Sequence, residues 1–200
     1  MGTRINRFVS YNSIPNIEEG INNVLYYDND KKIELPTGSY EISDIATYIK
    51  EYLKNENTEI TIKANNNTLK SEIFSNVEID FEKDDSLASI LGFEKIKLAP
   101  NIWHSSTLPV SIVRVESVRL VCNLISSSYN NGIEGHIIHE FYPTVEPGFK
   151  IVEAPANVIY LPVNTSTIHN ITVRLEDQEG RLINFRDEII TLRLHLKKQQ

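Results

Sequence analysis

Two histidines, His136 and His139, lie three residues apart, and Glu140 directly follows the second. On a helix this spacing would place both imidazoles on one face, where they could bind a metal ion such as Zn²⁺. The apolar residues Ile137 and Ile138 between them indicate a strand instead, and residues three apart on a strand point to opposite faces. The sequence therefore predicts no metal site at this position.

A nucleophile or an acid–base pair is the next chemistry to consider. Cys122 lies in the apolar run 118–125, which predicts a small buried hydrophobic residue, because a reactive thiolate needs an exposed electropositive setting. No Walker loop, G-x-S-x-G elbow, G-x-G-x-x-G loop or C-x-x-C pair occurs in the chain. A glycosidase needs two carboxylates at the right separation, and the candidates are Glu140, Glu146, Glu153, Asp177 and Glu179. Their spacing in sequence does not establish such a pair, so we expect no catalytic residue, no cofactor and no enzyme activity.

Composition limits the class of protein further. The chain has 200 residues, of which 40% are hydrophobic, and this is enough for one sandwich or barrel domain. A net charge of −7 and a pI near 5.3 argue against direct sequence-specific binding of nucleic acid, although a local basic patch stays open. A single cysteine allows no disulfide framework, and no apolar run is long enough for a membrane span or an export signal. We expect a soluble chain from a reducing compartment, with no membrane span.

The residues from 118 to 197 show one strand after another. In the last of these, Ile189, Leu192, Leu194 and Leu196 would point inward, while the outward positions would be Thr191, Arg193, His195 and Lys197. A turn at Glu179-Gly180 predicts a hairpin, because glycine readily takes a positive φ. This density of strands predicts a β-sandwich or barrel.

The first part of the chain mixes short strands with two helices. Residues 1–23 are polar and rich in asparagine, without a sustained period, which predicts an extended or flexible N-terminal arm. Strands are expected at 24–27, 32–35, 59–63, 69–74 and 77–81, followed by a long loop over 94–111. One helix is expected from Ser43, as its N-cap, to Lys54, and a shorter one between Asp84 or Asp85 and Gly92. Residues 24–200 would then form one domain.

Four residues in loops are candidates for an interface. Trp103 lies in a loop flanked by prolines, where it could pack half-buried or anchor a partner. Tyr129, Asn130 and Asn131 lie in the polar loop 126–132, and Tyr129 could be a contact residue or an ordinary loop residue. Both interpretations stay open for each aromatic side chain.

A resemblance to a known family rests on segments spread along residues 24–197. They are IELPTGSYEISDI at 33–45, SLASILGF at 86–93, VCNL at 121–124, IHEF at 138–141, PGFKI at 147–151, VIYLPV at 158–163 and LEDQEGRLINF at 175–185. On these segments the chain resembles the minor capsid, or penton, proteins of Polinton (Maverick) elements and related adintoviruses in the adenovirus-like lineage. None of the segments is a catalytic motif, so the resemblance implies no active-site residue.

The resemblance implies a mainly β fold, a single jelly-roll β-sandwich with one or two short inserted helices. It also implies a structural protein of the virion capsid, made in the cytoplasm or nucleus of a host cell. Such a protein forms a homopentamer at the icosahedral vertices, beside a double jelly-roll major capsid protein, and a spike or receptor would be a further partner.

A cyclic pentamer needs two different patches on each subunit. The sequence points to the end loops and the N-terminal arm as their source, so deleting residues 1–20 is expected to weaken capsid incorporation and leave the domain folded. The competing class is a jelly-roll binding module that recognises carbohydrate or a cell-surface receptor. A monomer with an exposed aromatic patch would favour that class.

Overall fold

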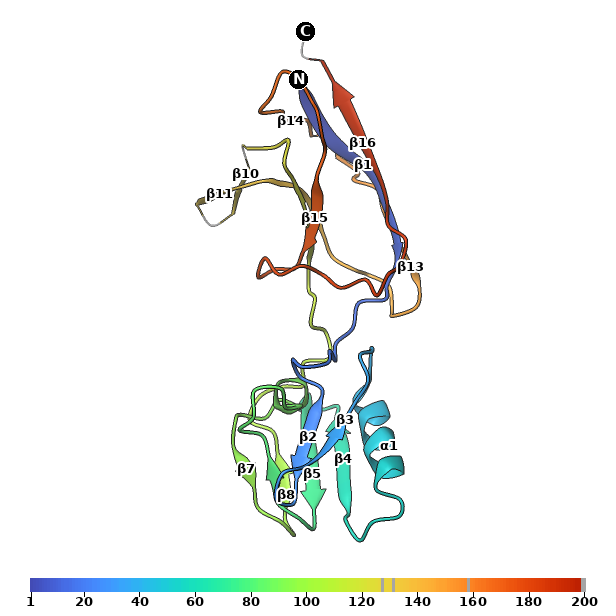
Figure 1. Ribbon diagram of the computed structural model, residues 1–200, viewed down its shortest axis with the longest axis vertical. Helices are drawn as coiled ribbons and strands as arrows, with labels where there is room; N and C mark the ends of the chain where they lie inside the picture. The colour runs from blue at the N-terminus through green and yellow to red at the C-terminus, as the bar shows by residue number, and fades with distance from the viewer. Residues whose placement is uncertain (127, 131, 158, 199–200) are drawn as a thin grey trace. The chain divides into compact units, whose positions relative to one another are not determined.

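The computed structural model describes residues 1–126, 128–130, 132–157 and 159–198 (Figure 1). The chain divides into two compact units. The inserted unit is the continuous segment Pro15–Arg114, and the sandwich unit combines residues 1–14 with residues 115–200. The expected arm at 1–23 and single domain at 24–200 do not match these units, because a segment with its own hydrophobic core interrupts the sandwich after its first strand.

The first sheet of the sandwich unit is organised around β1 (Gly2–Tyr11). On one side β1 pairs antiparallel with β16 (Thr191–Lys197), and on the other side it pairs with β13 (Lys150–Glu153) and β14 (Leu161–Pro162) (Figure 1). A register shift between Ile5 and Arg7 adds one residue, so Ile5 and Phe8 both point into the core although they are three residues apart. β1 is therefore the middle strand of this sheet.

The second sheet places β9 (Val118–Cys122) between β12 (Ile137–Phe141) and β15 (Val173–Glu176). A separate hairpin is formed by β10 (Ser128–Asn130) and β11 (Ile133–Gly135). The two sheets enclose one core, in which the Phe8 ring of the first sheet lies 5.1 Å from the Phe141 ring of the second. This packing is the sandwich architecture, and the predicted fold class, mainly β of jelly-roll type with short helices, is confirmed.

The N-terminal segment differs most from its prediction. Residues 2–11 form a ten-residue strand rather than an arm, and Phe8 in that strand is fully buried. The pairing partners β13 and β16 lie at the other end of the chain, so no neighbouring sequence indicates the pairing. The expectation that residues 1–20 can be removed without harm to the fold is reversed by this pairing.

Deletion of residues 1–11 is expected to unfold the sandwich unit. Three strands lose their shared partner, and the core loses Ile5 and Phe8, each worth about 1.5–3 kcal/mol of burial, from a total stability of about 5–15 kcal/mol. Amide dispersion in a two-dimensional NMR spectrum measures this. The inserted unit is the internal control, because its core contains no residue of β1. Retained dispersion of the sandwich amides in the truncated chain would contradict the expectation.

The inserted unit contains two small sheets and both helices of the described chain. One sheet has the order β3-β2-β6-β7, with β2 (Val24–Tyr27), β3 (Lys31–Glu34), β6 (Ile79–Asp80) and β7 (Lys97–Leu98). The other consists of β4 (Ile60–Asn65), β5 (Lys70–Ser75) and β8 (Trp103–Ser105). The expected strands are confirmed to within a few residues, whereas the expected loop at 94–111 contains the short strands β7 and β8.

The helices α1 (Ile42–Tyr52) and α2 (Ala88–Leu91) match their predicted positions but not their predicted N-caps. α1 packs beside β4 through Ile42, Ile45 and Ile49, and its N-cap is Glu41, which forms a capping box with Asp44, rather than Ser43 (Figure 1). α2 begins after Leu87 rather than at Asp84 or Asp85. Gly92 ends α2 at φ 74°, as predicted, and a Cβ there would lie 2.3 Å from the carbonyl oxygen of Leu108.

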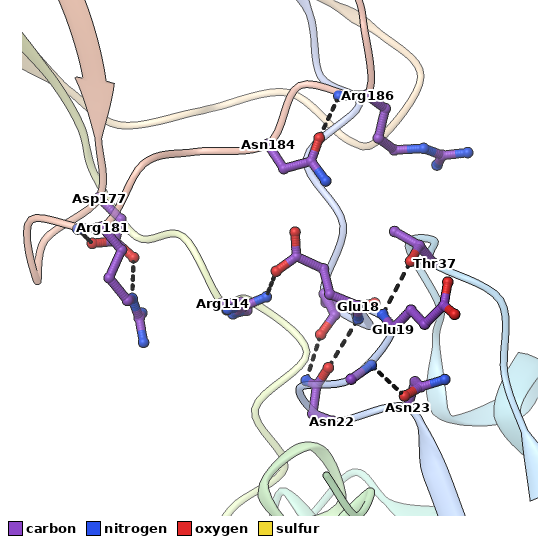
Figure 2. Close-up of polar contacts among 12 residues, drawn as sticks. Glu18, Glu19, Asn22, Asn23, Thr37, Arg114, Asp177, Arg181, Asn184 and Arg186 are labelled. Atoms are coloured by element: carbon purple, nitrogen blue, oxygen red, sulfur yellow. Dashed lines mark hydrogen bonds and ion pairs between the residues drawn. The ribbon is translucent and has the colours of Figure 1, made fainter.

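The turn after β15 is held by one buried carboxylate. Asp177 accepts hydrogen bonds from the backbone N–H groups of Glu179 and Arg181, each at 2.9 Å, and its Oδ2 lies 2.7 Å from Arg181 Nε (Figure 2). Gly180 has the positive φ that the sequence predicts for this turn. Burial raises the pKa of Asp177, but the N–H donors and the Arg181 guanidinium lower it more, so the pKa lies below its ordinary value.

Asp177→Asn is expected to destabilise the sandwich unit by about 1–3 kcal/mol, because the charged acceptor is lost from a buried turn. A depressed pKa stabilises the fold above the unfolded-state pKa, near 3.9, and this contribution is lost as the pH falls through the lower folded-state value. Urea unfolding of the unchanged chain and of the Asp177→Asn chain should therefore give different free energies of unfolding at pH 6, and this difference should become smaller below about pH 4. A difference that stays the same at every pH would contradict the role of the charge.

Candidate docking face

Trp103 lies on β8 in the inserted unit and is about half exposed, at 49%. The centroids of the Trp103 and Phe74 rings lie 5.6 Å apart, and the Lys63 ammonium lies 4.4 Å from the centroid of the Trp103 ring. Part of the indole is therefore covered within its own sheet, while the rest remains available to a partner. Its role as an interface residue stays a prediction.

Tyr129 lies on β10 in the sandwich unit and is 70% exposed. Asn130 ends the same strand, and Asn131 lies outside the described residues. Because Trp103 belongs to the inserted unit, the structure does not assign the four predicted interface residues to one compact unit. We keep Tyr129 and its neighbours as a separate predicted contact.

The predicted chemical candidates are engaged in structural contacts. The Nδ1 atom of His136 contacts the carbonyl oxygen of Ile125, and His139 Nε2 lies 2.9 Å from Glu153 Oε1. Cys122 is fully buried, as predicted. Arg119 Nε lies 3.2 Å from Glu140 Oε1. Among the described residues no group of three or more His, Cys, Asp or Glu side chains is placed to hold a metal ion.

None of the helices in the described ranges has both the length and the apolar character needed to cross a membrane.

A different feature stands out in the structure, the outer face of the first sheet of the sandwich unit. One end of this face, the apolar half, consists of Val9, Tyr11, Val152 and Ile189, with Lys150 beside the Tyr11 ring and the exposed Phe149 just before β13. Val9 pairs with Val152 on the side away from the core, and Phe149 and Ile189 lie in the segments that lead into β13 and β16. Phe149 is 62% exposed and Ile189 is 83% exposed. These are large apolar areas to leave in water.

The other end of the same face, the cationic half, consists of Arg4, Arg7, Arg193, His195 and Lys197. The register pairs Arg4 with His195 and Arg7 with Arg193, all on the side away from the buried Ile5 and Phe8. Tyr160 lies among them: its hydroxyl is 2.7 Å from His195 Nδ1, and the guanidinium of Arg4 is 5.4 Å from its ring centroid. The face therefore combines an apolar end with a basic end.

The cationic half lacks neutralising partners. Within the described residues, Arg4, Arg7, Arg193 and Lys197 form no ion pair with a carboxylate, and the buried Nε atom of Arg4 has no hydrogen-bond partner. Like charges placed directly opposite across two strands, as in the pair of Arg7 with Arg193, destabilise a sheet. The fold tolerates this repulsion on its own surface.

Sequence reasoning found only part of this face. The outward positions of Arg193, His195 and Lys197 are confirmed, and so are the inward positions of Leu192 and Leu194. Ile189 is exposed rather than inward, because it precedes β16, and Leu196 is also exposed, because it lies opposite Thr3 at the end of the sheet. Sequence reasoning missed the residues that β1 contributes to this face. Their signal was the placement of the apolar residues Ile5 and Phe8 next to arginines, which is typical of a strand with one buried side.

The inserted unit has a hollow of its own. The loop Glu18–Asn23 is held by hydrogen bonds from Glu18 N to Asn22 Oδ1 and from Gly20 N to Asn23 Oδ1, and Arg114 pairs with the Glu18 carboxylate (Figure 2). Beside this loop lies a hollow of about 380 Å³, whose lining includes Glu19, Glu34 and Asp85. Tyr26 donates a hydrogen bond to Asp85 at 3.1 Å, so part of this acidic lining is already satisfied.

The fold defines a class, an antiparallel two-sheet β-sandwich that carries a separate α+β insertion. No protein-family model matches the chain, and no curated protein matches it in sequence. Among solved structures the chain is similar to the mavirus penton protein, with 15% identity over 96% of this chain and 84% of that one, at a TM-score of 0.45. This likeness is distant, and the assignment of the sandwich depends on the strand pairing itself.

Arg193→Glu is expected to stabilise the isolated chain by roughly 0.5–1 kcal/mol, because the change turns a directly opposed like-charge pair into an opposite-charge pair. Thermal unfolding at a concentration low enough for every chain to be monomeric should then show a midpoint higher by a few degrees. Arg174→Glu is the matched control, since Arg174 on β15 already pairs with Glu176 and the same charge change removes an attraction. A lower midpoint for Arg193→Glu than for the unchanged chain would show that Arg7 and Arg193 do not repel each other.

Proposed function

We propose that this chain is a structural subunit of a viral capsid, of the penton type, that assembles into pentamers at the icosahedral vertices. The observation that carries the proposal is the outer face of the first sheet, where large apolar side chains stay exposed on regular strands and at their ends. A rigid surface of this kind is suited to contact another protein. The resemblance of the ordered sequence segments to penton proteins gives the class of assembly.

The geometry suits a ring of identical subunits. A closed ring requires that one patch on each subunit meets a different patch on the next. The apolar half offers the buried centre of such a contact, because Tyr and Phe contribute strongly at interfaces, and the polar and charged residues beside it would form the rim. A double jelly-roll major capsid protein would then contact the outside of the ring.

The competing function is a binding module for carbohydrate or a cell-surface receptor. The exposed ring of Tyr129 on the β10–β11 hairpin favours it, since aromatic side chains are common contact residues. This function does not require self-association, so the mass in solution separates the two proposals.

Light scattering after size-exclusion chromatography is expected to give a mass near five times 22.9 kDa for the unchanged chain. Val152→Asp combined with Ile189→Asp should shift the mass toward the monomer, because each exposed anchor is worth about 1–2 kcal/mol and each 1.4 kcal/mol is tenfold in affinity. The fold should persist, since neither side chain belongs to the core.

Ile102→Asp is the control for this experiment, because Ile102 is an exposed isoleucine of the inserted unit. It should leave the mass of the assembly unchanged. An unchanged chain that stays monomeric at its highest soluble concentration contradicts self-assembly and favours the binding module. An assembly that survives the double substitution places the contact on another surface.

A further inference from the structure

The charge of the chain is unevenly divided between its two units. The inserted unit has 17 Asp and Glu against 10 Lys and Arg, which gives a net charge of −7, whereas the sandwich unit has 10 of each and is neutral. The whole net charge of the protein therefore belongs to the inserted unit. The two units of one chain therefore differ in net charge.

Within the neutral sandwich unit, positive charge is concentrated on one face. Three other arginines of this unit form ion pairs with carboxylates. These pairs are Arg119 with Glu140, Arg174 with Glu176, and Arg181 with Asp177. The cationic half described above has four permanent positive charges without such a partner among the described residues. Its strand positions contribute no carboxylate on the outer side.

The inserted unit has the opposite excess. Many of its lysines are already paired, as in Lys31 with Asp28, Lys32 with Glu34 and Lys97 with Glu78. Five exposed carboxylates have no cationic partner within the described part of the chain, namely Glu19, Glu51, Glu59, Glu82 and Glu94. These carboxylates remain available to a positively charged surface.

We propose that the cationic half of the outer face binds the acidic inserted unit of a second copy of this chain. This inference rests on the proposed function, because a ring of identical subunits needs two different patches that fit each other, and here each copy carries both charges. The −7 net charge of the inserted unit attracts the cationic half of a neighbour. A nucleic acid is the other anionic occupant of a basic face, and retention of a DNA fragment, measured below, distinguishes it from a second copy.

The cationic side chains are built for such a contact. Arg4 and Lys197 both lie over the Tyr160 ring, at 5.4 and 5.7 Å from its centroid, so their positions are partly fixed before a partner arrives. Arginine can bind a carboxylate through two parallel hydrogen bonds. A carboxylate placed between Arg7 and Arg193 would also relieve the repulsion between those two guanidinium groups.

The test is a double charge reversal, Arg7→Glu with Arg193→Glu. This variant keeps a like-charge pair across the two strands, so its fold is balanced as in the unchanged chain, while the charge at these two positions is reversed and the cationic half as a whole is neutralised by Arg4 and Lys197. We expect the dissociation constant of the assembly to rise at least tenfold, and we expect added salt to weaken the unchanged assembly. Arg174→Glu, on the other sheet, should leave the assembly intact.

A charge swap then identifies the occupant. A second variant carries lysine in place of Glu19, Glu51, Glu59, Glu82 and Glu94, and each variant alone should assemble poorly. Mixed together, the two variants should form pairs that contain one copy of each, which native mass spectrometry detects by mass. Mixed pairs support the proposal, and their absence overturns it.

Three further outcomes are distinguishable. If the unchanged chain does not assemble, both this inference and the proposed function fail. If the unchanged chain assembles and the double reversal assembles equally well, only this inference fails. A double reversal that keeps the assembly but abolishes retention of a DNA fragment would show that the face binds a polyanion, and this too overturns the inference.

Discussion

The strand β1 is the constraint on which the sandwich depends. It is the shared partner of β13, β14 and β16, and Phe8 in its middle packs against Phe141 of the opposite sheet and lies 6.3 Å from Phe185. Its partners follow the whole inserted unit in sequence. The chain must therefore close a loop of residues 15–114 before the first sheet can form, and contacts of such long range are slow to make. An inserted unit with its own core eases this closure, because it folds through its own contacts.

The same strand also determines what the protein presents to its surroundings. The alternation of a strand gives each inward residue an outward neighbour, so burying Ile5 and Phe8 exposes Arg4, Arg7 and Val9. The bulge near Asn6 sets which residues share a side: without the extra residue, Phe8 would face solvent. The register of β1 therefore determines both which of its side chains pack in the core and which lie on the outer face.

The parts that sequence could predict are those with local causes. The Ile42, Ile45 and Ile49 stripe of α1, the positive φ of Gly92 and Gly180, and the strand around His139 all depend on nearby residues. The role of β1 and the division into two units depend on pairing between distant segments, which no local period encodes. Ile189 shows the limit at one position: its apolar side chain suggested an inward residue, but it lies three residues before Leu192, so the alternation of β16 places it on the outward side, beyond the last paired residue Thr191.

The opposed arginines Arg7 and Arg193 show how stability and assembly can conflict on a sheet. Elsewhere in the sandwich unit three arginines are paired with carboxylates, and Arg181 with Asp177 is the clearest case, because the same carboxylate also accepts two backbone N–H groups of the turn. On the outer face the fold instead keeps two guanidinium groups in opposed positions, at a cost of about 0.2–1 kcal/mol. A single acidic residue on either strand would remove that cost and would also neutralise the face. The repulsion is therefore best understood as part of an interaction that is completed only when an acidic surface covers the sheet.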